Sequence, residues 1–215
     1  MRLSVISLML LLLMAASFAM AEEEYNFLKQ GYSFFDTFNG GSGGAVGLLE
    51  PLQTQNPPFD FDFVNYQVSY AYLDMQIVSY QAIGSLRVWS LTGGTIGIYE
   101  DADFDLDYGA SPATGIATAT DGTVALIGTI STAAFTFNVL SETGTFSGLF
   151  MWTGGSRFAE LGDLATTEWN IFHGASSDDQ VNVPPGYHSR FAGRIYVMGP
   201  TATQDSSWSQ IRALY

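Results

Sequence analysis

Residues 64–72 read Val-Asn-Tyr-Gln-Val-Ser-Tyr-Ala-Tyr, so large apolar side chains alternate with small or polar ones. Successive side chains of an extended chain point to opposite faces. This period of two therefore predicts a β-strand with one buried face. Eight later segments are also rich in β-branched and aromatic residues, with Gly, Asp or Ser between them. They are residues 85–91, 95–99, 115–120, 123–130, 134–140, 145–152, 168–173 and 192–198.

The short spacing of these segments, with no long helical pattern between them, predicts an all-β fold. We expect an antiparallel β-sandwich of the jelly-roll type over residues 59–199, with short peripheral helices. Asp121-Gly122 predicts a hairpin, because a type I′ turn needs positive φ at both central residues. Residues 141–144 predict a second turn, residues 22–30 one or two helical turns, and residues 206–214 a short terminal helix.

The chain begins with the pattern of an exported protein. Arg2 precedes an almost wholly apolar run over residues 5–16, and Ala19-Met20-Ala21 stands before three glutamates. This order predicts a secretory signal peptide over residues 1–21, too short and wrongly flanked for a membrane span. We therefore expect a secreted bacterial protein, periplasmic or at the cell surface. Residues 22–58 would form an N-terminal segment that contains a Gly-rich loop, and residues 200–215 would form the C-terminal segment.

Composition narrows the partners of this chain. Without the leader, six basic residues stand against 21 acidic ones, which gives a net charge of −15. That charge repels phosphate backbones and anionic lipid, so we expect no nucleic-acid partner. The absence of cysteine excludes disulfides, thiol catalysis and zinc–thiolate sites. At 47% hydrophobic and 14% aromatic, the chain has ample material for one folded core.

An acidic run spans residues 100–107. In an extended conformation its alternate aspartates share one face, roughly 7 Å from one to the next. Carboxylates at that spacing need solvent or a cation, and Ca²⁺ prefers such hard oxygen ligands. The EF-hand pattern fails, because the required Gly and Glu are absent from the run. The alternative is a solvated acidic edge that discourages strand-to-strand aggregation. The candidate calcium ligands are Asp101, Asp103, Asp105 and Asp107.

Residues 59–63 alternate Phe with Asp, which predicts another half-buried strand. Asp60 and Asp62 would share an ion with the later run only if the two segments were neighbours. Residues 40–44 match the G-x-S-x-G pattern of a nucleophile elbow, but the flanking segments lack the helix that this motif needs. A flexible Gly/Ser loop over residues 39–44 is therefore the preferred interpretation.

The two histidines of the chain are His173 and His188, with Asp178-Asp179 between them. Two imidazoles and a carboxylate suit zinc, but these separations match no local zinc-ligand spacing. We expect ordinary loop histidines. No motif in the sequence is specific enough to identify a catalytic site. We therefore assign no catalytic residue and favour a non-enzymatic role.

Five short segments in the middle and end of the chain combine glycine with β-branched or aromatic residues: residues 95–101, 121–128, 144–148, 152–155 and 193–197. In these segments the chain resembles exported bacterial proteins of the exosortase-associated, PEP-CTERM-sorted type. The resemblance spans roughly residues 64–198. It consists of loose β-strand sequence patterns and includes no catalytic motif. These proteins end in Pro-Glu-Pro, a hydrophobic helix and basic residues, a tail that is absent from residues 211–215. The resemblance implies a surface or matrix protein.

Three functions remain open from the sequence. The first is a non-catalytic structural or adhesive protein that contacts cell-surface or matrix components, assisted by divalent cations at its acidic edge. The second is a glycan-binding module or carbohydrate-active enzyme, with exposed aromatic side chains stacked on sugar rings. The third is an outer-membrane barrel, which the expected strands fit poorly because membrane strands need ~9–11 residues. The tryptophans available for stacking are Trp89, Trp152, Trp169 and Trp208.

Overall fold

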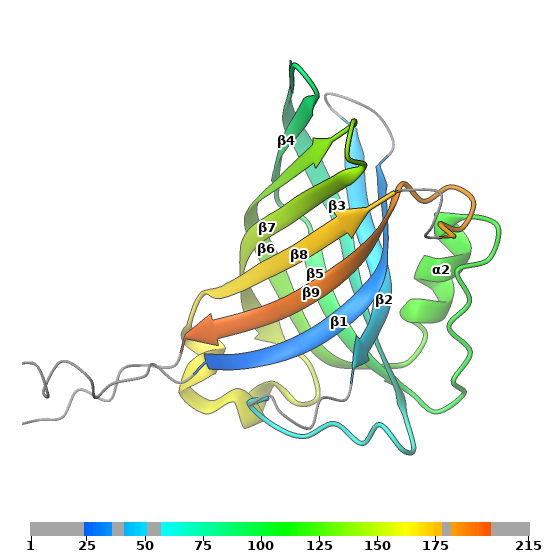
Figure 1. The fold of residues 1–215 in the computed structure, drawn as a ribbon. Helices are drawn as coiled ribbons and strands as arrows, with labels where there is room; N and C mark the ends of the chain where they lie inside the picture. The colour runs from blue at the N-terminus through cyan, green and yellow to red at the C-terminus, as the bar shows by residue number, and fades with distance from the viewer. Residues whose placement is uncertain (1–23, 36–40, 51–56, 178–181, 199–215) are drawn as a thin grey trace, which may run out of the picture. The chain divides into compact units, whose positions relative to one another are not determined.

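The structure is a computed structural model that describes residues 24–35, 41–50, 57–177 and 182–198. The expected signal peptide (1–21) and terminal helix (206–214) lie outside these ranges. The description concerns the compact unit Tyr25–Val197 (Figure 1). Its elements are β1 (Glu24–Phe35), β2 (Ser42–Glu50), β3 (Gln67–Ile83), β4 (Leu86–Thr92), β5 (Thr95–Asp101), α2 (Pro112–Ala119), β6 (Thr123–Asn138), β7 (Thr143–Gly154), the 3₁₀ helix η1 (Phe158–Thr166), β8 (Trp169–Ser176) and β9 (Ser189–Met198).

The strands form one closed sheet. Neighbouring strands pair in antiparallel order along the chain, and the last strand, β9, lies beside the first, β1. Strands β4 and β5 occupy a single position, because both lie between β3 and β6 and pair with different halves of them. The result is an eight-stranded antiparallel barrel of up-and-down order, visible in Figure 1.

The expected β-sandwich of jelly-roll type is therefore wrong, whereas the all-β class with short helices is confirmed. Alternating apolar and polar side chains have the same appearance on the inner face of a sandwich and of a barrel. The two folds differ here in the pairing of β1 with β9, which come from opposite ends of the described chain. Closure leaves the eight-stranded ring without the free edges that a sandwich has to protect.

A bend separates β4 from β5. Gly93 and Gly94 have φ values of 66° and 90°, which glycine adopts at little cost because it has no Cβ. On β3, Asp74 has a φ of 59° at the point where the strand changes its partner from β5 to β4. The long strand β3 can therefore curve around the barrel and keep a partner along its length.

The inside of the barrel is apolar, and its outside is largely polar. On β7, Phe146, Phe150 and Trp152 point inward and are buried, whereas Thr145 and Ser147 point outward and are exposed. The barrel is therefore a filled core and not an open channel. The seven largest fully buried side chains come from five strands and are Trp169, Tyr70, Tyr72, Lys29, Phe146, Phe150 and Phe191.

One end of the barrel is plugged by aromatic side chains. Phe59 and Phe61 lie 5.8 and 5.7 Å from the ring of Phe27, near the start of β1. The Arg157 guanidinium lies over the same two rings, 4.6 and 5.0 Å from their centroids, and pairs with Glu100 at 3.1 Å. We call this the closed end, where β1, β3, β6 and β8 begin, and the opposite end the pocket end.

Residues 59–63 do not form the expected strand, because they lie in the loop that carries this plug. The expected alternation is present: Phe61 is buried while Asp60 and Asp62 are exposed. The Asp62 carboxylate accepts the backbone N–H groups of Val64 and Asn65 at 3.2 and 3.1 Å, which fixes the turn that follows.

Helix α2 lies against the outside of the sheet. Pro112 occupies its first turn, where the fixed φ of proline suits a helix start. Its buried residues, Gly115 and Ala119, face β2 and β3, where Val46 and Ala71 belong to the same apolar cluster as Ala119. Neither α2 nor η1, the two helices of the described ranges, has the length and apolar character of a membrane-spanning helix.

Local expectations had mixed outcomes. The strand expected at residues 115–120 is wrong, because α2 occupies it, and the Asp121-Gly122 turn therefore joins a helix to a strand. The turn expected near residues 141–144 is confirmed between β6 and β7. The helical turns expected at residues 22–30 are wrong, because β1 begins at Glu24. The described part of the expected 39–44 loop is mostly the start of β2.

Candidate functional site

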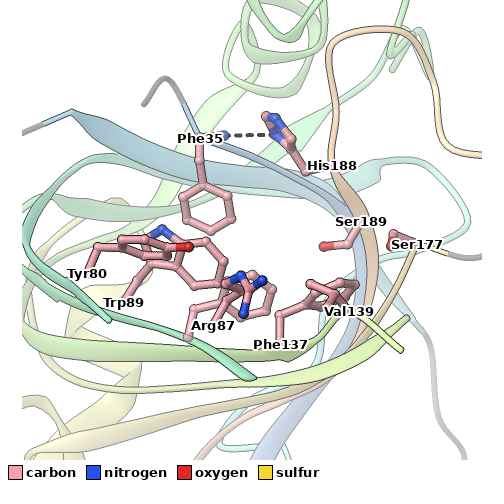
Figure 2. Close-up of a pocket in the computed structure, with 10 residues that line it drawn as sticks. Phe35, Tyr80, Arg87, Trp89, Phe137, Val139, Ser177, His188 and Ser189 are labelled. Atoms are coloured by element: carbon pink, nitrogen blue, oxygen red, sulfur yellow. Dashed lines mark hydrogen bonds between the residues drawn. The ribbon is translucent and has the colours of Figure 1, made fainter. Parts of the chain in front are cut away.

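A cavity of about 380 Å³ lies at the pocket end of the barrel (Figure 2). Small-molecule sites have volumes of ~300–1,000 Å³, so this cavity is of suitable size. Most of its wall is aromatic or aliphatic, and it is assembled from strands that are far apart in the sequence. The lining residues are Phe35, Tyr80, Arg87, Trp89, Phe135, Phe137, Val139, Ser177, His188 and Ser189.

Sheet register assembles the aromatic wall. Tyr80, Trp89 and Phe135 are direct cross-strand partners on β3, β4 and β6. The ring centroids of Tyr80 and Trp89 are 5.2 Å apart, and those of Trp89 and Phe135 are 5.3 Å apart. Phe35, the last residue of β1, stacks on Phe135 at 5.3 Å. Such pairs contribute about 0.5–1.5 kcal/mol each beyond their buried area, so the wall is preformed.

Arg87 supplies a permanent positive charge in the wall. Its Nη1 donates to the carbonyl oxygens of Gly84 and Leu86 at 2.8 and 3.0 Å. Within the described ranges, no carboxylate lies at ion-pair distance from this guanidinium. Its Nη2 and Nε groups can therefore donate to an anionic or carbonyl group of a bound molecule.

The segment before β9 is tied to β1 beside the cavity. The His188 backbone N–H donates to the Ser33 carbonyl at 2.8 Å, and its Nδ1 accepts the Phe35 N–H at 3.2 Å (Figure 2). The Ser33 and Ser189 hydroxyls are 2.6 Å apart. His188 thus lies in a loop, as expected, and its ring is held by the backbone of a neighbouring strand.

A buried amine lies deeper in the barrel. Lys29 projects inward from the middle of β1, is the single lysine of the 215-residue chain, and is only 2% exposed. Its Nζ is 4.2 Å from the ring centroids of both Tyr70 and Tyr72. Both ring nitrogens of His173 are within hydrogen-bonding distance of this Nζ, and the Tyr72 hydroxyl is 3.5 Å from Nε2 of the same histidine.

Burial favours the neutral forms of these groups. No aspartate or glutamate is among the buried side chains of the described residues, so no carboxylate compensates a charge on Lys29. Cation–π contacts with two rings offer about 2 kcal/mol, less than the several kcal/mol that burial of an ion costs. Desolvation lowers the pKa of Lys29 well below its usual value, and desolvation together with Lys29 lowers the pKa of His173.

Sequence reasoning missed this pair. The helix expected at residues 22–30 hid the inward position of Lys29, and His173 was expected in a loop but lies fully buried in β8. The sequence contains one feature that could have indicated an unusual lysine. The chain has a single lysine, and it lies in a segment rich in apolar residues that includes Phe27.

The structure brings together only two of the four predicted calcium ligands. One carboxylate oxygen from each of Asp101, Asp105 and Asp121 lies within 4.8 Å of the other two, and Asp103 and Asp107 are outside this group. Desolvation, followed by the nearby charges of Asp121 and Asp101, raises the pKa of Asp105. The cluster offers oxygen ligands for a hard cation, and three like charges that repel one another when it is empty.

The extended geometry assumed for the acidic run is wrong. Glu100 and Asp101 end strand β5, and the rest of the run is a loop. Phe104 has a φ of 53°, which interrupts the period-two alternation of the aspartates. The Asp107 carboxylate instead accepts the Gly109 N–H at 2.8 Å and fixes a turn before α2.

The remaining sequence motifs do not converge on a site within the described ranges. His173 and His188 do not form a metal-binding group with any carboxylates there, and Asp178-Asp179 lies outside those ranges. Ser42 opens a strand and not the helix of a nucleophile elbow, and Asp60 and Asp62 are not in the acidic cluster.

Comparison with known proteins finds no match among protein-family models, curated proteins or solved structures. The class of protein is therefore defined by its own fold and site: a closed eight-stranded antiparallel barrel with an aromatic cavity at one end. The resemblance to exosortase-associated proteins stays a prediction.

Proposed function

We propose that this protein binds a small apolar molecule in the cavity at the pocket end, with an anionic or carbonyl group of the ligand at Arg87. The observation that supports this function is the preformed aromatic wall around about 380 Å³. Apolar area removed from water contributes about 25 cal/mol per Å², so a ligand that fills this space gains most of its affinity from the rings. The role is binding and not catalysis.

The polar groups of the wall set the orientation of the ligand. Arg87 carries the permanent charge, and its guanidinium can form charge-assisted hydrogen bonds of about 1.5–3 kcal/mol. One such bond at the end of an apolar body favours an amphipathic ligand, such as a medium-chain fatty acid, over a sugar with many hydroxyls.

The experiment is isothermal titration with decanoate and decanol. We expect one site per chain. Ser177→Trp, which fills the cavity, should weaken both ligands at least tenfold, whereas Ser147→Trp on the exposed face of β7 should weaken neither. Arg87→Met should weaken decanoate about 10–100-fold and decanol little, with Arg194→Met as the charge-matched control. Failure of both ligands to bind, or equal binding by the cavity-filling variant, would refute the proposal.

The glycan alternative has less support. Its expected stacking platform needs exposed tryptophans, but Trp89, Trp152 and Trp169 are 8%, 2% and 0% exposed, and Trp208 lies outside the described residues. A structural or adhesive role at a bacterial surface is compatible with ligand binding and stays a prediction. Loss of surface retention after deletion of the barrel residues is the measurement that tests it.

A further inference from the structure

We propose that Lys29 forms a covalent imine with an apolar aldehyde or ketone that enters the barrel through the cavity at the pocket end. The inference rests on the proposed function, because the apolar body of the carbonyl ligand fills the same cavity, while its carbonyl group lies at Lys29 and not at Arg87. It adds a reactive group that the cavity itself lacks and names the ligand class as an apolar carbonyl compound.

The first support is the isolation of the amine. The Lys29 Nζ is surrounded by two tyrosine rings and one imidazole, with no buried carboxylate in the described part of the barrel. A neutral amine is a nucleophile, and a neutral imine needs no counter-ion. The interior therefore suits the reactant and the product better than it suits an ammonium or an iminium ion.

The second support is the thin layer of rings that separates the cavity from the amine. The cross-strand row Tyr80, Trp89 and Phe135 continues through Phe146 to His173. The Phe191 ring lies 5.7 Å from Phe135, which lines the cavity, and 4.9 Å from His173. His173 in turn hydrogen-bonds to Lys29. The rings of Phe135 and Phe191 are therefore the apolar layer between the cavity and the amine.

The third support is a buried hydroxyl without a partner. The Tyr70 hydroxyl has no hydrogen-bond partner among the described residues, although Tyr70 is fully buried. It lies next to Gly31, where an added Cβ would be 2.7 Å from the oxygen. The Lys29 Nζ contacts the ring of the same tyrosine. The hydroxyl is therefore an unpaired donor inside the barrel, on a side chain that the amine contacts, and can donate to the oxygen of an entering carbonyl group.

The reaction is balanced without any oxidant, reductant or further reactant. The Nζ lone pair attacks the carbonyl carbon, and the C=O π-electrons move to the oxygen, which Tyr70 stabilises by hydrogen bonding. A proton moves from nitrogen to that oxygen through His173, which gives a carbinolamine. Loss of the second N–H proton and of hydroxide, together one water, forms C=N. His173 is the positioning and proton-transfer residue.

Decanal is the probe, with decanol as its unreactive analogue. Native mass spectrometry distinguishes the two modes, because an imine complex is lighter by one water than a non-covalent complex. Borohydride treatment followed by peptide mapping locates the decyl group, and Lys29 and the chain terminus are the only amines. We expect one decyl group on Lys29 of the folded protein, suppressed by excess decanol and absent in Lys29→Met.

His173→Gln tests the mechanism with a rate. Proton-transfer residues typically contribute 10²–10⁴-fold, so we expect trapping to slow by roughly 100-fold or more while decanol affinity is unchanged. Trapping should also persist at pH 7, where an exposed lysine is only about 0.04% free amine. Phe172→Leu, on the exposed face of β8, is the matched control, and its rate should equal that of the native chain.

The two proposals fail separately. If decanol binds and decanal is trapped only at the chain terminus, or at Lys29 only after unfolding, the imine is refuted and ligand binding stands. If neither decanol nor decanal associates with the folded chain, the proposed function itself fails. Equal trapping with and without excess decanol would show that the cavity is not the route, which also overturns the inference.

Discussion

Replacement of Lys29 by methionine should remove the pH dependence of stability that the buried amine creates. Burial lowers the pKa of Lys29 in the folded protein, whereas the unfolded chain keeps a value of about 10.4. Between these two pKa values the unfolded chain binds one more proton than the folded protein. The free energy of unfolding therefore rises with pH by about 1.4 kcal/mol per unit, and it falls as the medium is acidified.

The size of this stability change follows from the difference between the pH and the pKa of lysine in the unfolded chain. At pH 7 an unfolded lysine lies about 3.4 units below its pKa, so its protonation favours the unfolded chain by about 4.6 kcal/mol if the folded amine is neutral. The methionine side chain loses the hydrogen bond to His173, worth about 1 kcal/mol. Lys29→Met should therefore be about 3–4 kcal/mol more stable at pH 7 and nearly equal to the native chain near pH 9.5.

Urea unfolding at half-unit steps from pH 7 to 9.5, followed by circular dichroism, measures how the free energy of unfolding changes with pH in the native chain and in Lys29→Met. The upper limit is needed because burial raises the pKa of Tyr70 and Tyr72, so ionisation of unfolded tyrosine reduces stability above it. Lys29→Arg is the second variant and should be strongly destabilised, since arginine stays charged. Parallel curves for the native chain and Lys29→Met would mean that the buried amine is protonated, and the reasoning would be wrong.

Three further predictions follow from the same structure. Burial lowers the pKa of His173, so native stability should rise between pH 5.5 and 6.5, and urea unfolding of His173→Phe should show a smaller slope. Phe61→Ala should cost about 3–5 kcal/mol in urea unfolding by emptying the plug, while exposed Asp60→Asn stays within about 0.5 kcal/mol. The pKa of Asp105 is raised, so the contribution of this carboxyl group to stability should fall as pH rises above about 4, and Asp105→Asn should raise Tm in EDTA. If the acidic cluster binds calcium, millimolar Ca²⁺ should raise the Tm of the native chain and of Asp103→Asn but not that of Asp105→Asn. An equal rise in Tm for all three proteins would contradict this expectation.

Much of the strand content was predictable, because local side-chain periodicity survives in the fold. Residues 85–91, 95–99 and 145–152 lie in strands almost as expected. Residues 145–152 show the reason most clearly, because buried positions alternate with more exposed ones along this segment. The strand expected at residues 115–120 was wrong because local propensities are divided there: isoleucine and threonine favour a strand, whereas alanine favours a helix. Pro112 and the packing of α2 on the sheet decide the conformation of this segment.

The candidate site was much less predictable, because its residues meet only through sheet register. Phe35, Tyr80 and Phe135 belong to three strands, and no short motif in the sequence links them. The acidic run was visible as composition, but Phe104 turns the chain within it and Asp121 joins from another segment. Long-range pairing and single backbone turns are the features that local patterns leave undetermined.

The position of the amine relative to the cavity is itself a consequence of barrel closure. Inward residues alternate along β8, so a slip of two residues would keep its apolar face inside. That slip would put Ile171 or Ala175 opposite Phe146 in place of His173, and Lys29 would lose its imidazole partner. The hydrophobic pattern of β8 is therefore compatible with a barrel in which Lys29 contacts His173 and with one in which it does not. The register observed, with His173 opposite both Phe146 and Gly193, joins the amine to the aromatic row that ends at the cavity.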